Sequence, residues 1–203
     1  MVPKLISADE IKKEFEGYDP CKVEVFHRRS TKIADKRFEE ELKKNTFNEV
    51  VLMCGGTAAG KTEFLSEYLN DFDGIVFDGT LSTKEGAEIK IKNVLRMKKK
   101  PIVCAVLPDS LKRAFVAFLH RDRKFKDDHF YKTHSGSMST LLWITKNFPN
   151  VEMRIYESSY SKKHMTFSKL VFPRKEQLIE FLEQAQYTEK EIINLISQGQ
   201  KNL

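Results

Sequence analysis

The sequence predicts an α/β fold, a three-layer domain with one mostly parallel sheet and additional helices at both ends of the chain. Two observations predict this fold class. Short apolar runs that are continuous along the chain are typical of strands covered on both faces, and segments with helical periodicity separate these runs. Such alternation builds a parallel sheet through right-handed crossovers. A chain of 203 residues can bury one substantial core, so we expect a single domain over residues 1–203.

Four segments are predicted as strands. They are Glu49–Cys54, Gly74–Phe77, Pro101–Leu107 and Val151–Tyr156. The first three are near-continuous apolar runs, as expected in the interior of a parallel sheet. Residues 47–158 contain all four strands and form the predicted core of the domain.

Helical patterns lie between these strands. The first helix begins at Thr62, directly after a glycine-rich loop, and the second is preceded by Ser82 at the first position of an S-x-x-E capping box. A third helix begins at Asp109 or Ser110. A fourth, with an apolar stripe on one face, is predicted from about Ser137 to Phe148.

Both ends of the chain are predicted to be helical. Residues 1–46 form an N-terminal helical extension, in which Ser7 opens an S-x-x-E capping pattern and Lys32–Lys43 is a charged helical stretch. Residues 159–203 form a C-terminal helical region of two helices, the second beginning with a T-x-x-E pattern at Thr188.

The strongest motif lies between the first strand and the first helix. The segment GGTAAGKT matches G-x-x-x-x-G-K-[ST] in the strand–loop–helix context that this motif requires. Its main-chain N–H groups and the helix N-terminus attract phosphate, its lysine reaches the β and γ phosphates, and its last hydroxyl can bind Mg²⁺. A glycine turn without a ligand is the alternative, but a chance match in a chain of this length is on the order of 1%. The candidate nucleotide-binding residues are Gly55, Gly56, Thr57, Ala58, Ala59, Gly60, Lys61 and Thr62.

The motif predicts a P-loop NTPase fold, with 47–158 as the nucleotide-binding core and ATP or GTP with Mg²⁺ as cofactors. Two large classes of P-loop protein are not favoured. Switch GTPases carry an N-K-x-D element, and motor ATPases usually carry a long apolar run that ends in an acidic pair; the sequence contains neither. A short chain with a bare P-loop therefore indicates a small kinase.

Asp78 is the candidate acidic residue of the site. It follows the second strand, and ligands in open α/β sheets bind at the carboxyl ends of strands. Asp78 is therefore expected to hold Mg²⁺ or to accept the proton of an attacking hydroxyl. A turn or capping aspartate is the structural alternative. Asp71 and Asp73 are weaker candidates.

A basic segment follows the third helix. Arg121, Arg123, Lys124 and Lys126 are concentrated in a polar stretch that could close over the phosphates and stabilise charge on the transferred group. A merely solvated loop is the alternative. The nearby pair His129 and His134 has no third ligand and no helical alignment, so we expect no metal site there.

These segments resemble the zeta-toxin-like P-loop kinases. The resemblance covers roughly Val50 to Glu157 and is carried by the glycine loop, DGTLS at Asp78, HRDRKF and THSGS. It implies a kinase-type P-loop fold in which Lys61 and Thr62 bind phosphate and metal. It also implies that Arg121 and Arg123 are lid arginines and that the nucleotide is ATP or GTP with Mg²⁺. Zeta toxins proper phosphorylate a hydroxyl of UDP-N-acetylglucosamine and are held inactive by an antitoxin.

The chain departs from this family in one segment. Only the 15 residues Glu63–Phe77 separate the glycine loop from Asp78, whereas the full-length toxins have an additional segment there that bears the acidic base. Either Asp78 lies on the metal side and its partner base is missing, or Asp78 acts as the base itself. The resemblance therefore leaves the acceptor open.

Three functions follow from these features. The leading one is ATP-dependent transfer of a phosphoryl group to a hydroxyl of a small anionic acceptor, such as a nucleotide sugar. Lys61, Asp78, Arg121 and Arg123 are then the catalytic residues, and Thr62 joins Asp78 as a metal ligand. The first alternative is a nucleic-acid end kinase, because 35 Lys and Arg exceed 29 Asp and Glu to give a net charge of +6. The second is a slow NTPase that gates protein binding. An antitoxin or other protein regulator is the partner that the resemblance suggests.

The remaining features concern the cellular setting. Cys21, Cys54 and Cys104 have neither a CxxC pair nor zinc-ligand spacing, so the sequence indicates no disulfide framework or zinc site. We expect Cys54 and Cys104 to be buried and reduced. The N-terminal residues lack the apolar segment of a signal peptide, and the longest apolar run, Ile102–Leu107, is too short to cross a bilayer. A cytoplasmic protein without membrane contact is expected.

Overall fold

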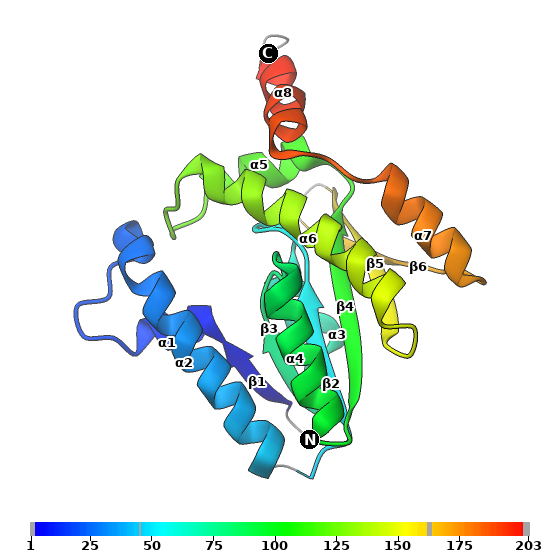
Figure 1. Cartoon of the computed structure of the whole chain (residues 1–203). Coiled ribbons are helices and arrows are strands. Elements are labelled where there is room, and N and C mark those ends of the chain that lie inside the picture. The colour runs from blue at the N-terminus through cyan, green and yellow to red at the C-terminus, as the bar shows by residue number, and fades with distance from the viewer. Residues whose placement is uncertain (1–2, 45, 162–163, 201–203) are drawn as a thin grey trace.

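The computed structural model describes residues 3–44, 46–161 and 164–200. A six-stranded sheet with strand order β1-β3-β2-β4-β5-β6 forms its centre (Figure 1). Each pair of neighbouring strands is parallel except β5 and β6, which are antiparallel. The α/β fold with a mostly parallel sheet is thereby confirmed. The strands are β1 (Lys4–Ser7), β2 (Glu49–Cys54), β3 (Ile75–Asp78), β4 (Lys100–Pro108), β5 (Glu152–Ser161) and β6 (His164–Leu170).

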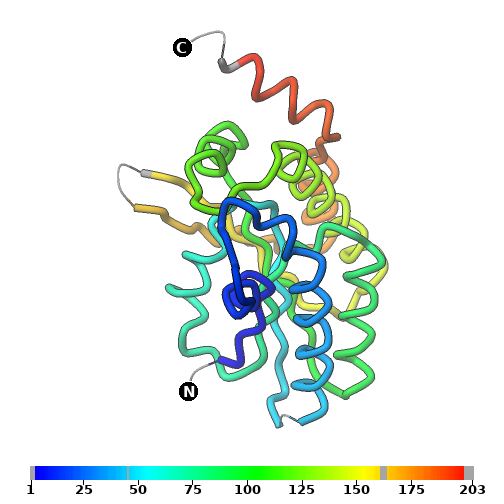
Figure 2. Tube along the Cα trace, turned by 90° about the vertical axis from the view of Figure 1, so that its left-hand side faces the viewer, coloured from blue at the N-terminus to red at the C-terminus, as the bar shows by residue number. Residues whose placement is uncertain are grey.

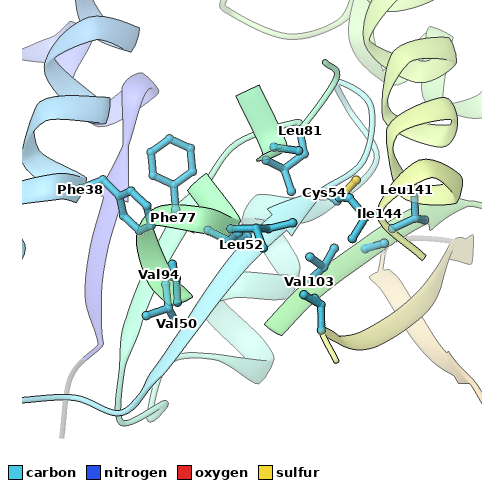
Figure 3. Packing of buried hydrophobic residues seen from close by; sticks show 14 of the residues in the cluster. Phe38, Val50, Leu52, Cys54, Phe77, Leu81, Val94, Val103, Leu141 and Ile144 are labelled. Carbon is cyan, nitrogen blue, oxygen red and sulfur yellow. The ribbon is translucent and has the colours of Figure 1, made fainter. Parts of the chain in front are cut away.

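Helices lie on both faces of the sheet but cover them unequally. Side chains of α2, α4, α6 and α7 pack on one face of the sheet, in a cluster that includes Leu52 and Ile144 (Figure 3). Phe64 of α3 packs on the other face, in a cluster with Met53. A third cluster joins α5, α6 and α8, and α8 extends from the body of the molecule beyond the sheet (Figure 2). The α-helices are α1 (Ala8–Lys13), α2 (Val23–Lys44), α3 (Lys61–Tyr68), α4 (Lys84–Arg96), α5 (Leu111–Leu119), α6 (Asp127–Asn147), α7 (Lys175–Gln184) and α8 (Glu189–Gln200), with a 3₁₀ turn at Pro20–Lys22.

The central strands have the burial that their apolar runs predict. Every side chain from Val50 to Cys54 in β2 and from Ile102 to Val106 in β4 is buried. Cys54 and Cys104 are therefore inside, and burial raises the pKa of each thiol to about 12, which keeps both protonated. No helix in the described part of the chain has the length and apolar content needed to cross a membrane.

The first residues differ from the helical expectation for 1–46. Lys4–Ser7 forms β1, an edge strand paired in parallel with β3, and the register places Ser7 opposite Asp78. α1 follows at once, because the Ser7 hydroxyl accepts a hydrogen bond from the Asp9 N–H and caps the helix. A strand of four residues is too short to show a periodicity of its own.

The region 159–203 also begins with strand rather than helix. β5 continues to Ser161, so the expected boundary at residue 158 falls within a strand, and the chain returns through β6 before α7 begins at Lys175. β6 alternates between exposed and half-buried side chains, which gives it no continuous apolar run. The T-x-x-E pattern at Thr188 does cap the last helix: Thr188 N–H donates to Glu191, and Glu191 N–H donates to the Thr188 hydroxyl.

Two helix starts differ from the sequence prediction. α4 is capped by Thr83, whose hydroxyl accepts the Gly86 N–H at 3.2 Å, and not by Ser82. α6 begins at Asp127, ten residues before Ser137. Its first half buries polar side chains against the glycine loop, so it lacks the apolar stripe that identifies a helix.

α4 buries one face against the sheet and exposes the other, which predicts that two of its isoleucines contribute very differently to stability. Ile91 is fully buried, whereas Ile89 is 58% exposed on the same helix. Ile91→Ala should lower the free energy of unfolding by about 2–5 kcal/mol, because it removes buried apolar contacts and leaves a cavity. Ile89→Ala should change it by no more than about 0.5 kcal/mol. Chemical denaturation of both variants measures the difference, and equal effects would contradict the assigned face of α4.

Candidate functional site

A cavity of about 580 Å³ opens at the carboxyl ends of the parallel strands. Ligands in open α/β sheets bind at this position. The glycine loop, the end of β3, α1, α2 and the segment between α5 and α6 all contribute side chains to its wall. The lining includes Asp9, His27, Thr57, Lys61, Thr62, Asp78, Arg121, Arg123, Phe125 and His129.

The glycine loop turns directly from β2 into α3. Gly60 has φ +89° and caps α3, a backbone conformation that a residue with Cβ rarely adopts. Ala59 is buried, and its carbonyl accepts the Ser158 hydroxyl of β5 at 2.8 Å. Ala58 and Thr57 line the cavity. The N-terminus of α3 therefore faces the cavity, where it favours an anion.

Lys61 lies across this loop. Its ammonium donates to the carbonyls of Gly55 and Gly56, each at 2.8 Å. Burial lowers the pKa of Lys61, and the nearby Asp78 carboxylate opposes this shift. Phosphate oxygens at the mouth of the loop would be stronger acceptors for this ammonium than the two carbonyls.

Asp78 and Thr62 line the same cavity as Lys61. The Ser7 hydroxyl donates to Asp78 Oδ2 at 3.0 Å, and burial raises the pKa of Asp78 while Lys61 lowers it. A carboxylate and a hydroxyl suit Mg²⁺ when phosphate oxygens and water complete the shell. Among the described residues, no group of three or more His, Cys, Asp or Glu side chains could hold a metal alone.

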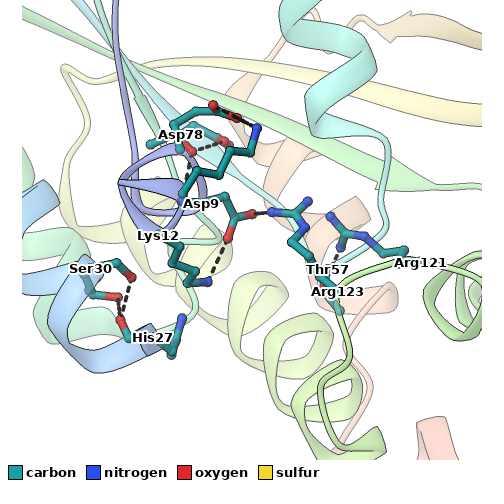
Figure 4. A network of polar contacts seen from close by, with 12 residues as sticks. Asp9, Lys12, His27, Ser30, Thr57, Asp78, Arg121 and Arg123 are labelled. Carbon is teal, nitrogen blue, oxygen red and sulfur yellow. Dashed lines mark hydrogen bonds and ion pairs between the residues drawn. The ribbon is translucent and has the colours of Figure 1, made fainter. Parts of the chain in front are cut away.

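The basic segment contributes two of its four cations to the cavity. Arg121 donates from Nη1 to the Thr57 hydroxyl at 2.8 Å, and Arg123 forms an ion pair with Asp9 (Figure 4). Burial lowers the pKa of Arg121, and the neighbouring Arg123 adds to the shift. Lys124 instead donates to the Leu119 carbonyl and Lys126 lies outside the cavity lining, so neither joins the site.

The sequence did not identify Asp9 and Lys12 of α1 as site residues. Asp9 binds the Lys12 ammonium through Oδ1 at 2.8 Å and Arg123 through Oδ2. Partial burial would raise the pKa of Asp9, but Lys12 and Arg123 outweigh it and hold the pKa well below its usual range. The S-x-x-E pattern at Ser7 correctly predicted the start of α1. It gave no indication that the pairing of β1 with β3 brings α1 beside Asp78. Asp71 and Asp73, in contrast, precede β3 and lie outside the cavity lining.

α6 holds the glycine loop through THSGS, which lies within the helix. Thr133 Oγ1 accepts the Thr57 N–H at 3.1 Å, and His134 Nε2 lies 2.8 Å from the Thr57 carbonyl. A carbonyl only accepts, so His134 Nε2 carries the proton. The ring packs so closely that a Cβ on Gly56 would overlap it. The position of the His134 ring therefore requires glycine at position 56.

Aromatic rings extend the cavity beyond Asp9. Phe125 stacks on His129 with ring centroids 4.1 Å apart, and His27 contacts both rings edge-on from α2. The Lys12 ammonium lies 5.1 Å from the Phe125 centroid. Burial lowers the pKa of His129 to about 4, so its imidazole is neutral at pH 7.

Comparison with known proteins gives a structural likeness. A scan of protein-family models and a search of curated proteins give no match to the chain. A chain of the AvrRxo1-ORF1:-ORF2 crystal structure with ATP has a TM-score of 0.50 at 13% identity, over 71% of this chain and 66% of that chain. A chain of the native AvrRxo1-ORF1:-ORF2 complex has a TM-score of 0.48 at 12% identity, over 77% and 72%. At such identity the first match shows a similar fold alone.

The buried His134 predicts a pH dependence of stability. Burial lowers its pKa from 6.5 to about 4, so between these values the unfolded chain binds a proton that the folded chain does not. The free energy of unfolding should therefore fall as the pH decreases from 6.5 to 4. In His134→Asn the free energy of unfolding should decrease less steeply with falling pH than in the unmodified chain, by at most about 1.4 kcal/mol per pH unit. Denaturation from pH 4 to 8 tests it, and an unchanged slope would contradict it.

Proposed function

We propose that the chain is a zeta-toxin-like P-loop kinase that transfers the γ-phosphoryl group of ATP or GTP, with Mg²⁺, to a hydroxyl of a small anionic acceptor. One observation carries the proposal. The ammonium of Lys61, the carboxylate of Asp78 and the guanidinium groups of Arg121 and Arg123 line one cavity at the glycine loop. Phosphoryl transfer needs this combination of positioning and opposite charge around the γ-phosphate.

The chain's own groups supply the binding of the triphosphate. The main-chain N–H groups of the glycine loop and the N-terminus of α3 hold the phosphates, and Lys61 moves from the Gly55 and Gly56 carbonyls to phosphate oxygens. Arg121, anchored on Thr57, and Arg123 neutralise charge on the transferred group. Thr62 and Asp78 would hold Mg²⁺, which offsets the charge of the β and γ oxygens when bound.

The lining of the cavity favours an anionic acceptor. Its cations are Lys61, Lys90, Arg121, Arg123 and Lys132, and its carboxylates are Asp9, Glu63 and Asp78. A volume of about 580 Å³ is within the usual range for small-molecule sites, so a nucleotide and part of an acceptor fit together. A nucleotide sugar is an acceptor with the required charge and hydroxyls.

The likeness to a complex crystallised with ATP supports the choice of ATP as phosphate donor. The same structure holds a pair of proteins, ORF1 and ORF2. By analogy with it and with the zeta toxins, we propose that a protein regulator binds this chain.

Two substitutions separate nucleotide binding from transfer. Lys61→Ala should weaken ATP binding roughly 10- to 100-fold, because it removes a charge-assisted hydrogen bond to the phosphates. Asp78→Asn should retain binding and lose transfer, because it removes the charge that holds Mg²⁺. Titration with a fluorescent ATP analogue measures binding. Transfer is followed from γ-labelled ATP to a panel of sugar nucleotides, nucleosides and oligonucleotide ends.

Lys36→Ala is the matched control, since Lys36 is 79% exposed on α2 and should be neutral in both assays. Unchanged ATP affinity in Lys61→Ala would contradict the phosphate site. Full transfer in Asp78→Asn would remove the role assigned to that carboxylate.

A further inference from the structure

We propose that Asp9 is the general base that accepts the proton of the attacking hydroxyl, while Asp78 remains on the metal side. This inference rests on the proposed phosphotransferase function. The segment between the glycine loop and Asp78 lacks the additional stretch that bears the acidic base in the full-length zeta toxins. The N-terminal unit β1–α1 brings an acidic residue to the same cavity.

Ser7 fixes the two carboxylates relative to each other. Its hydroxyl donates its hydrogen to Asp78 Oδ2 at 3.0 Å and accepts the Asp9 N–H at 3.3 Å. The parallel pairing of β1 with β3 sets Ser7 and Asp78 directly opposite one another. Ser7 therefore holds Asp9 and Asp78 at neighbouring positions in the cavity.

The surroundings of the two carboxylates differ in kind. Asp78 lies beside Lys61, the lysine of the glycine loop, so it belongs to the triphosphate and metal end. Asp9 instead forms ion pairs with Lys12 and Arg123 (Figure 4). The Lys12 ammonium in turn lies against the aromatic wall formed by Phe125, His129 and His27. An acceptor against that wall would place its hydroxyl between Asp9 and the γ-phosphate.

The aromatic wall has free polar groups for such an acceptor. Within the described parts of the chain, the ring nitrogens of His27 and His129 form no hydrogen bond with protein, and both residues line the cavity. Neutral imidazoles offer one donor and one acceptor each, which suits a hydroxylated ligand. The stacked face of Phe125 and His129 adds an apolar contact surface.

The ion pairs of Asp9 suggest how its oxygen becomes free. Lys12, which is 1% exposed, holds Oδ1, whereas Arg123, which is 23% exposed, holds Oδ2. Phosphate oxygens compete for Arg123 once the triphosphate is bound. Oδ2 is then released toward the acceptor while Lys12 keeps the carboxylate ionised and in place.

The proposed transfer forms one bond to phosphorus and breaks another. The acceptor oxygen forms a bond to the γ-phosphorus, and the bond from that phosphorus to the β–γ bridging oxygen breaks, with its electron pair leaving on ADP. The hydroxyl proton passes to Asp9 Oδ2 and from there to solvent. With water as acceptor, the same step yields ADP and inorganic phosphate.

The test uses the full chain with Mg·ATP, with water as acceptor and then with the acceptor panel described above. Asp9→Ala should reduce ADP formation by about 10²- to 10⁴-fold, the usual contribution of a general base. It should retain affinity for a fluorescent ATP analogue within about threefold. Added formate should restore part of the lost rate, because a small carboxylate can occupy the space left by the side chain.

Arg123→Ala distinguishes a base from an anchor. It should also slow the reaction, but formate should not restore it, since the carboxylate of Asp9 is still present. Equal losses in Asp9→Ala and Arg123→Ala, neither of them restored by formate, would mean that Asp9 only positions the arginine and would overturn the proposal. Asp9→Asn, which keeps the size of the side chain, replaces Asp9→Ala if thermal unfolding shows that the alanine variant does not fold.

Two further outcomes distinguish the role of Asp9 from the proposed kinase function. Undiminished turnover in Asp9→Asn would overturn the role of Asp9 and leave the proposed kinase function standing. A wild-type chain that neither binds nor turns over Mg·ATP would overturn the kinase function, and the role of Asp9 with it.

Discussion

The shape of the site depends on the hydrogen bonds of one residue, Thr57. Its N–H donates to Thr133, its carbonyl accepts from His134, and its hydroxyl accepts from Arg121. A loop of small residues has little side-chain packing to define its conformation, so these bonds from α6 and from the segment before it hold the turn open for a ligand. The hydrogen bond from Arg121 to the Thr57 hydroxyl also fixes this arginine of the basic segment beside the glycine loop. The loop and the basic segment, 64 residues apart in the chain, are parts of one structure.

Charge balance is the second constraint on the cavity. Lys12 is almost wholly buried, and a buried ammonium is costly unless a carboxylate faces it. Asp9 satisfies Lys12 and Arg123 together, and Ser7 connects Asp9 to Asp78. A single polar network therefore extends from Lys12, beside the aromatic wall, to Asp78, whose charge acts on Lys61 of the glycine loop. Since its members are mutually satisfied before any ligand arrives, binding of a polyanion exchanges partners within an existing network and creates no unpaired charge.

The sequence predicted the parts of the molecule that are governed by local rules. β2 and β4 are identified by continuous apolar runs, and the glycine loop by a pattern in which every position has its own chemical reason. β1 and β6 lie at the edges of the sheet, where burial is partial and a strand needs no apolar run. The early start of α6 was missed because Thr133 and His134 face the glycine loop, so that face of the helix is polar. Asp9 was missed because only tertiary pairing brings it to the site.

The edge position of β1 has a consequence for dynamics. Four residues hydrogen-bonded on one side only make a small cooperative unit, and such units open locally at a lower free energy than the whole domain unfolds. Detachment of this strand would withdraw Ser7 and Asp9 while β2, β4 and the glycine loop kept their structure. Amide protons of Leu5 and Ile6 would then exchange with solvent long before those of β2. While β1 is detached, the chain would still bind the nucleotide but would lack Asp9 for the transfer step. The fraction of sites occupied by nucleotide and the rate of turnover would then vary independently.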